Sequence, residues 1–165
     1  MRVNEEIENL QSQVAKLGRR KQIVYDVITE GNKALGVGRQ IDKIIGEGSG
    51  YVNRYTFMAD HFERLRRLRV LMDDMIVQIT AFKRKYCDMA EKILDESNAA
   101  EVNKTIDKLC KNLSSFHSIA GCKRKLGRAV DGVYGVISYC ESILEQLETN
   151  KNEIQARLDA LSEEL

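Results

Sequence analysis

The sequence predicts an all-α protein: an antiparallel hairpin or bundle of long helices packed through coiled-coil-type heptad seams. The 165 residues include no proline, so the strongest helix breaker is absent. Charged residues make up 31% of the chain and aromatic residues 6%, a composition typical of long helices. Apolar residues also recur at alternating spacings of three and four positions, the period of a helix packed along a seam.

The first predicted helix covers about residues 3–45 of a single helical domain that spans 1–165. Gly36 and Gly38 predict a kink near 36–38. The glycine-rich run at 46–50 then predicts a turn. No Gly-Lys-Ser/Thr follows this run, which argues against a phosphate-binding loop. The first helix opens with the seam residues Val3, Ile7, Leu10, Val14 and Leu17.

The second predicted helix covers about residues 52–96, and its seam runs from Tyr55 to Ile93. Additional apolar residues widen this stripe near its middle, which indicates a central helix covered on more than one side. Met72, Met75 and Met89 continue the seam with aromatic residues. We therefore interpret these methionines as core rather than as a groove for a partner.

The third predicted helix covers residues 98–165. Each of its glycines costs about 1 kcal/mol inside a helix, but the three-four alternation continues unbroken from Phe116 to Leu165. The alternation favours one helix of roughly 65 residues, about 100 Å long at 1.5 Å per residue. The first two helices reach only about 65 and 70 Å. The last heptads of the third helix therefore project, unless it bends back, the N-terminal seam extends alongside, or a partner covers them.

This overhang leads us to expect a partner helix, from another protein or from a second copy of the chain. Gly121, Gly132 and Gly135 form a small-residue stripe that would admit another backbone, or else are tolerated surface glycines. The predicted partner-binding residues are the N-terminal seam residues Val3, Ile7, Leu10, Val14 and Leu17 and the C-terminal seam residues Leu144, Leu147, Ile154, Leu158, Leu161 and Leu165.

Charge is unevenly distributed along a chain whose net charge is +1, with +6 over residues 52–128 and −6 over residues 129–165. The acidic end could meet the basic middle, or the basic middle could bind nucleic acid. Overall neutrality and the lack of a recognition-helix or RNA-binding motif argue against nucleic acid, which we keep as the alternative function. Basic clusters occur at 19–21, 64–69, 83–85 and 123–128.

Residues suited to chemistry are sparse. The nearest approach to a metal cluster is Cys110, His117 and Cys122, but Cys110 and His117 would lie about 10 Å apart along a helix, too far to share an ion. Paired Glu-x-x-His motifs of di-iron bundles are absent. We therefore expect no enzyme activity, no metal and no cofactor.

The four widely spaced cysteines indicate buried, reduced thiols and thus a cytoplasmic protein, although export without a cleaved signal peptide would leave the same pattern. We expect no membrane span, because no run approaches the roughly 18 apolar residues that a span requires.

The arrangement of seams and turn resembles the small helical partner proteins of bacterial type VII secretion, in particular the YwqH-like partners of LxG-type toxins. The resemblance rests on the N-terminal seam at Ile7 to Leu17, the break at 36–50 and the C-terminal seam ending in Leu161 and Leu165. The turn contains no Trp-x-Gly, and no tyrosine is followed four residues later by an acid. The resemblance implies a non-enzymatic targeting partner that binds the helical N-terminal domain of a secreted effector.

Overall fold

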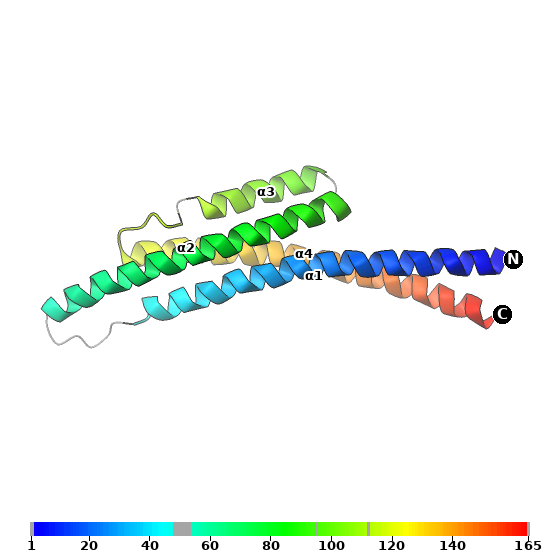
Figure 1. Ribbon diagram of the computed structural model, residues 1–165, viewed down its shortest axis with the longest axis horizontal. Coiled ribbons are helices and arrows are strands. Elements are labelled where there is room, and N and C mark those ends of the chain that lie inside the picture. The colour runs from blue at the N-terminus through cyan, green and yellow to red at the C-terminus, as the bar shows by residue number, and fades with distance from the viewer. Residues whose placement is uncertain (1, 48–53, 95, 112, 165) are drawn as a thin grey trace.

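The computed structural model describes residues 2–47, 54–94, 96–111 and 113–164, and these residues form four α-helices (Figure 1). The helices are α1 (Arg2–Ile45), α2 (Arg54–Ile93), α3 (Glu96–Cys110) and α4 (Ile119–Glu163). No strand occurs among the described residues. The all-α prediction is confirmed.

The four helices form an elongated bundle in which α1 runs antiparallel to both α2 and α4 (Figure 1). The shorter α3 folds back along α2 and also touches α4. Gly31 of α1 faces Phe82 of α2, and Gly38 faces Met75. This antiparallel register places the end of α2 beside Arg20. Beyond that point α1 and α4 are the only described helices that continue, so we call residues 2–20 and 148–163 the distal arm and the remainder of the described chain the body.

The core of the body follows the apolar seam predicted for α2. Its side chains are completely buried from Leu68 to Met89, and they include Met72, Met75, Ile79, Phe82 and Tyr86. The interpretation of the methionines as core is confirmed. Tyr55 and Met58, at the start of the predicted seam, have side chains outside the described set. Val24 and Ile41 of α1 and Val133 of α4 complete this core, each with no exposed surface.

The prediction of one continuous helix over 98–165 is wrong, because α3 ends at Cys110 and α4 begins at Ile119. Ser118 caps α4: its backbone is extended, and its hydroxyl accepts a hydrogen bond from Gly121 N at 2.9 Å. The intervening segment preserves the apolar phase, since Leu113 and Phe116 are buried in the core. The three-four spacing across this segment therefore comes from two buried apolar residues in a non-helical chain reversal, and not from a continuous helix.

Glycines do not interrupt the long helices. Helix α1 passes through Gly36 and Gly38 without interruption, and α4 passes through all its glycines. Two glycines permit close packing: a Cβ on Gly31 would lie 2.8 Å from Ile137 Cδ1, and one on Gly132 would collide with the side chain of Leu109. Gly132 thus admits α3 onto α4, whereas a Cβ on Gly135 would meet nothing within 4 Å.

Candidate helix-binding groove and charged surfaces

The predicted partner-binding seams face each other across the distal arm. Gly31 lies opposite Ile137 and Gly38 opposite Val130, so a seven-residue step along α1 matches a seven-residue step along α4. The same register places Leu10 opposite Leu158. Among the predicted residues, Leu10, Leu147 and Leu158 are buried, and Val3, Ile7, Val14, Leu17, Leu144, Ile154 and Leu161 are half-buried. Leu165 lies outside the described residues.

The C-terminal overhang is therefore covered by the N-terminal seam, one of the three outcomes that the helix lengths allowed. Ion pairs tie the edges of the arm: Arg157 Nη2 lies 2.6 Å from Glu6 Oε1, and Lys21 pairs with Glu148. The hydrogen bond from Lys21 lowers the pKa of Glu148. The outward-facing positions of the arm are polar. Most of its narrow apolar seam is therefore occupied by the contact between α1 and α4 of the same chain.

A separate apolar groove opens between α1 and α4 in the body. Its hollow of about 310 Å³ is lined by Leu35 and Gly38 of α1 and by Leu126, Gly127, Val130 and Tyr134 of α4, with charged side chains at its rim. Tyr134 is 52% exposed. Tyr25, 47% exposed, is two heptads from the lining residue Arg39 and so projects from the same side of α1. Among the described residues, none from α2 or α3 lines this groove.

A cluster of cations lines two adjoining hollows where α3 turns into α4. One hollow, of about 340 Å³, is bordered by Lys108 and Lys111, and the other, of about 420 Å³, by Arg124. Lys125 and Arg128 line both. We call these five residues the basic corner. Lys125 is held in place because its ammonium donates to the carbonyl of Ser115.

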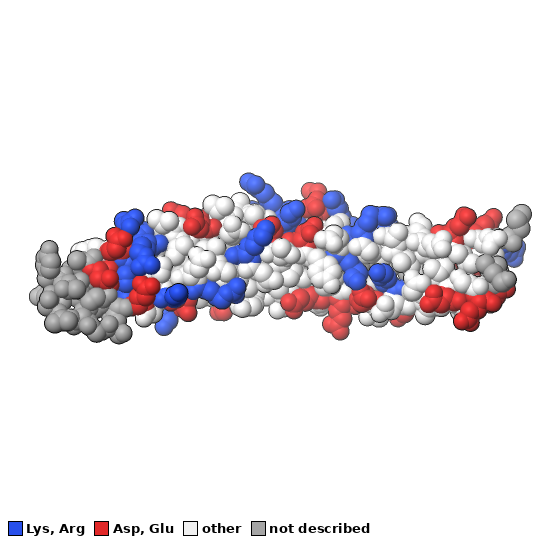
Figure 2. Space-filling model, turned by 60° about the horizontal axis from the view of Figure 1, so that its bottom comes forward, with Lys and Arg blue, Asp and Glu red and all other residues white. Residues whose placement is uncertain are grey.

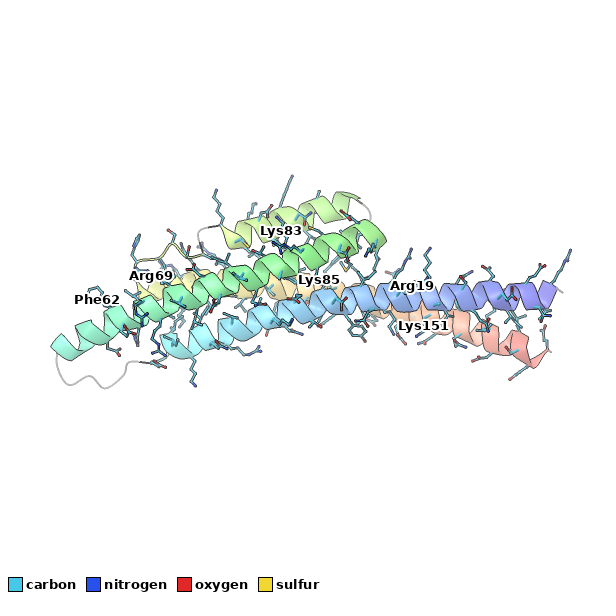
Figure 3. All side chains as sticks on the ribbon, in the orientation of Figure 1. Arg19, Phe62, Arg69, Lys83, Lys85 and Lys151 are labelled. Atoms are coloured by element: carbon cyan, nitrogen blue, oxygen red, sulfur yellow. The ribbon has the colours of Figure 1, made fainter. Side chains whose placement is uncertain are left out.

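The neighbouring helix α2 adds charge beside the basic corner. The guanidinium of Arg69 stacks over the ring of Phe116, 5.9 Å from its centroid. Figure 3 shows Arg69 on the stretch of α2 that faces the α3–α4 connection, whereas Lys83 lies farther along, between α2 and α3. Lys83 pairs with Asp107, and the hydrogen bond that its ammonium donates to this carboxylate raises the pKa of Lys83.

The cysteines are free thiols distributed through the body. Burial raises the pKa of Cys122 to about 11 and that of Cys140 to about 12, so both are protonated at neutral pH. Half-buried Cys87 donates to Asn103 Oδ1 at 3.1 Å. The hydroxyl of Tyr86 is buried without a hydrogen-bond partner among the described residues, and burial raises its pKa. In the described parts of the chain, His, Cys, Asp and Glu nowhere form a group of three that could hold a metal ion.

Sequence reasoning missed the groove and located the basic corner only in part. The cluster at 123–128 was recognised, but Lys108 and Lys111 join it only because α3 folds back against α4. Gly127 and Tyr134 carried a usable signal for the groove. They lie seven residues apart on the outward face of α4, away from the seam.

Comparisons of the chain with family models, with curated proteins and with solved structures found no match. The resemblance to type VII secretion partners therefore stays a prediction. Within the described residues, no helix combines the length and the apolar character that crossing a membrane requires.

Proposed function

We propose that this chain is a non-enzymatic adaptor that binds one amphipathic helix of a partner protein in the groove between α1 and α4. The observation that carries the proposal is the apolar hollow between these helices, floored by buried Leu35 and Gly38 and edged by the half-exposed Tyr134. Helix α2 packs along α1, and its Met75 and Phe82 reach the α1–α4 contact at Gly38 and Gly31. Among the described residues, none from α2 or α3 lines the hollow.

The geometry suits a helix better than a loop or a small molecule. Two long antiparallel helices form a straight groove, into which the i, i+3, i+4 and i+7 side chains of a third helix can pack. A Cβ on Gly127 would meet nothing within 4 Å, so a partner backbone can approach closely there. Tyrosines at the edge are suitable anchors. The rim mixes Arg39 and Lys123 with Asp42 and Asp131, so we expect binding that changes little with salt.

The test fills the groove in the free protein. A Cβ on Gly127 meets nothing within 4 Å, so we expect Gly127→Phe to keep the fold while its ring occupies the position of a partner side chain. Gly18→Phe is the matched control, because a Cβ on Gly18, in the distal arm, also meets nothing within 4 Å. Circular dichroism and thermal unfolding check that both variants fold like the wild type.

Wild type and both variants are immobilised, and the proteins that each retains from an extract of the native host are quantified. The helical segment of each protein retained specifically by wild type is then titrated, as a peptide, against all three proteins by calorimetry. We expect Gly127→Phe to weaken the peptide at least tenfold and Gly18→Phe to leave it unchanged. A partner peptide indifferent to Gly127→Phe would remove the groove. Absence of any direct helical ligand would remove the adaptor proposal.

The resemblance to secretion partners makes the proposed partner more specific: the helical N-terminal domain of a secreted effector, bound in the cytoplasm before export. Co-expression with such a domain from the same host is expected to yield a stable complex that Gly127→Phe disrupts. If a different helical protein is retained instead, the adaptor proposal stands and the secretion assignment fails.

A further inference from the structure

We propose that the basic corner binds the phosphate backbone of nucleic acid without reading its sequence. This inference goes beyond the helix-binding proposal and is independent of it. The basic corner lies between α3 and α4, whereas the groove lies between α1 and α4.

Unneutralised charge is the first observation. Within the described parts of the chain, Lys108, Lys111, Arg124 and Arg128 have no carboxylate partner, and no acidic side chain lines either hollow. Lys83, by contrast, is paired with Asp107. Cations held together without counter-charge repel one another, and a bound polyanion removes that repulsion.

The second observation is where the acidic residues lie. Over residues 2–15 and 152–164, at the tip of the distal arm, seven acidic side chains accompany two basic ones. Figure 2 shows carboxylates gathered at that end of the rod, where both termini lie. The tip cannot fold back onto the corner, because α4 is one continuous helix between them. A polyanion at the corner therefore meets two hollows that no acidic side chain lines, with the acidic tip at the other end of α4.

The shape of the cluster favours a polymer over a single compact anion. Five cations extend across two hollows that share Lys125 and Arg128, and Arg69 lies to one side over Phe116. Successive phosphates of a strand can occupy neighbouring hollows. Phe116 is buried and is not free to stack on a base, so we expect phosphate contacts only, which carry no sequence information.

The number of cations sets the expected salt dependence. Neutralising about four phosphates of a duplex, one for each of Lys108, Lys111, Arg124 and Arg128, gives a slope of log K against log salt near −3.6. Affinity should then fall on the order of a hundredfold between 50 and 200 mM salt. The helix-binding groove, with its mixed rim, should show no such dependence.

The experiment measures fluorescence anisotropy of a labelled 30-base-pair duplex with the full chain from 50 to 200 mM salt. The corner variant carries Lys111→Gln, Arg124→Gln and Arg128→Gln, all at exposed positions. The control variant carries Lys16→Gln, Arg19→Gln and Lys43→Gln, which remove the same charge at exposed positions outside the corner. Figure 3 shows Arg19 on the part of α1 that projects beyond α2.

We expect the corner variant to lose affinity on the order of a hundredfold at 50 mM salt and to flatten the slope by about 2.7. The control should stay within a few-fold of wild type. No binding by wild type at 50 mM salt, or equal loss in the two variants, would overturn the proposal.

Competitors separate the remaining explanations. Polyglutamate, which represents an acidic protein surface such as the arm tip of a second copy, should displace the duplex far less effectively than unlabelled duplex of another sequence. Equal displacement by polyglutamate overturns the assignment to nucleic acid. The duplex should bind Gly127→Phe as it binds wild type, so failure of the groove and failure of the basic corner are distinguishable.

Discussion

The body and the distal arm share one sequence pattern but differ in how completely that pattern is buried. In the body, seam residues such as Val24 and Phe82 have no exposed surface, because α2 packs along α1 where α1 meets α4. In the arm, the same three-four spacing leaves most seam residues half-buried, since only two helices meet there. The heptad period thus identifies which side chains face a neighbour. It does not tell how many neighbours there are, and that number decides the energetics.

Among the substitutions that test this comparison, we expect the largest loss of stability from one in the body. Phe82→Ala removes a completely buried ring between α1 and α2 and should lower the free energy of unfolding by about 3–5 kcal/mol. Phe62→Ala is the control on the same helix, because Phe62 is 62% exposed; it should change stability by less than about 0.5 kcal/mol. Urea titration followed by circular dichroism measures both. Equal effects would contradict the assigned core.

A matched pair of leucines tests the arm against the body directly. Leu126 and Leu158 are 5% and 8% exposed, yet Leu126 lies in the body and Leu158 in the arm. Leu126→Ala should cost about 3–4 kcal/mol and Leu158→Ala about 2 kcal/mol, since a two-helix arm can close around the gap more easily. Hydrogen exchange should show that Leu158→Ala accelerates exchange of arm amides only. Equal costs would mean that burial alone, without the number of packed helices, sets the energy.

Much of the fold could be predicted because the apolar residues that face the core recur at a regular spacing along each helix. The first two helices are observed close to their expected bounds, and the α2 seam identified the core. The third helix was mispredicted, since Leu113 and Phe116 keep the seam spacing while anchoring a non-helical reversal. Period alone cannot distinguish a buried loop residue from a helical one when both face the same core.

The candidate surfaces were harder to predict because they depend on tertiary neighbours. The predicted partner-binding seams are apolar stripes, but in the folded chain they pack against each other. Lys111 and Arg128 lie far apart in sequence and join one hollow only through the reversal between α3 and α4. The groove at Gly38 and Gly127 likewise requires knowing that α1 and α4, the two ends of the chain, are adjacent.

Two glycines of α1 should respond to alanine with opposite signs. A Cβ on Gly31 would lie 2.8 Å from Ile137 and 3.0 Å from Phe82, so Gly31→Ala overpacks the body and should cost roughly 1–2 kcal/mol. A Cβ on Gly18, in the arm, meets nothing within 4 Å. Gly18→Ala should therefore stabilise by up to about 1 kcal/mol through helix propensity. Thermal unfolding reads both shifts, and a stabilising Gly31→Ala would show that the three helices are not in contact there.

The smallest expected effect concerns a lysine within the seam of the arm. The register places Lys151 of α4 opposite Leu17, and Figure 3 shows Lys151 on the stretch of α4 that pairs with the N-terminal part of α1. Lys151→Leu should restore an apolar layer and stabilise the arm by about 1 kcal/mol. Hydrogen exchange of amides in 2–20 and 148–163 should slow by a few-fold, while the body is unchanged. The adjacent exposed Asn152→Leu is the control and should not slow exchange. If Asn152→Leu slows exchange as much as Lys151→Leu does, added hydrophobicity rather than the seam position is responsible. The register inferred from Gly31 and Gly38 then does not extend into the arm.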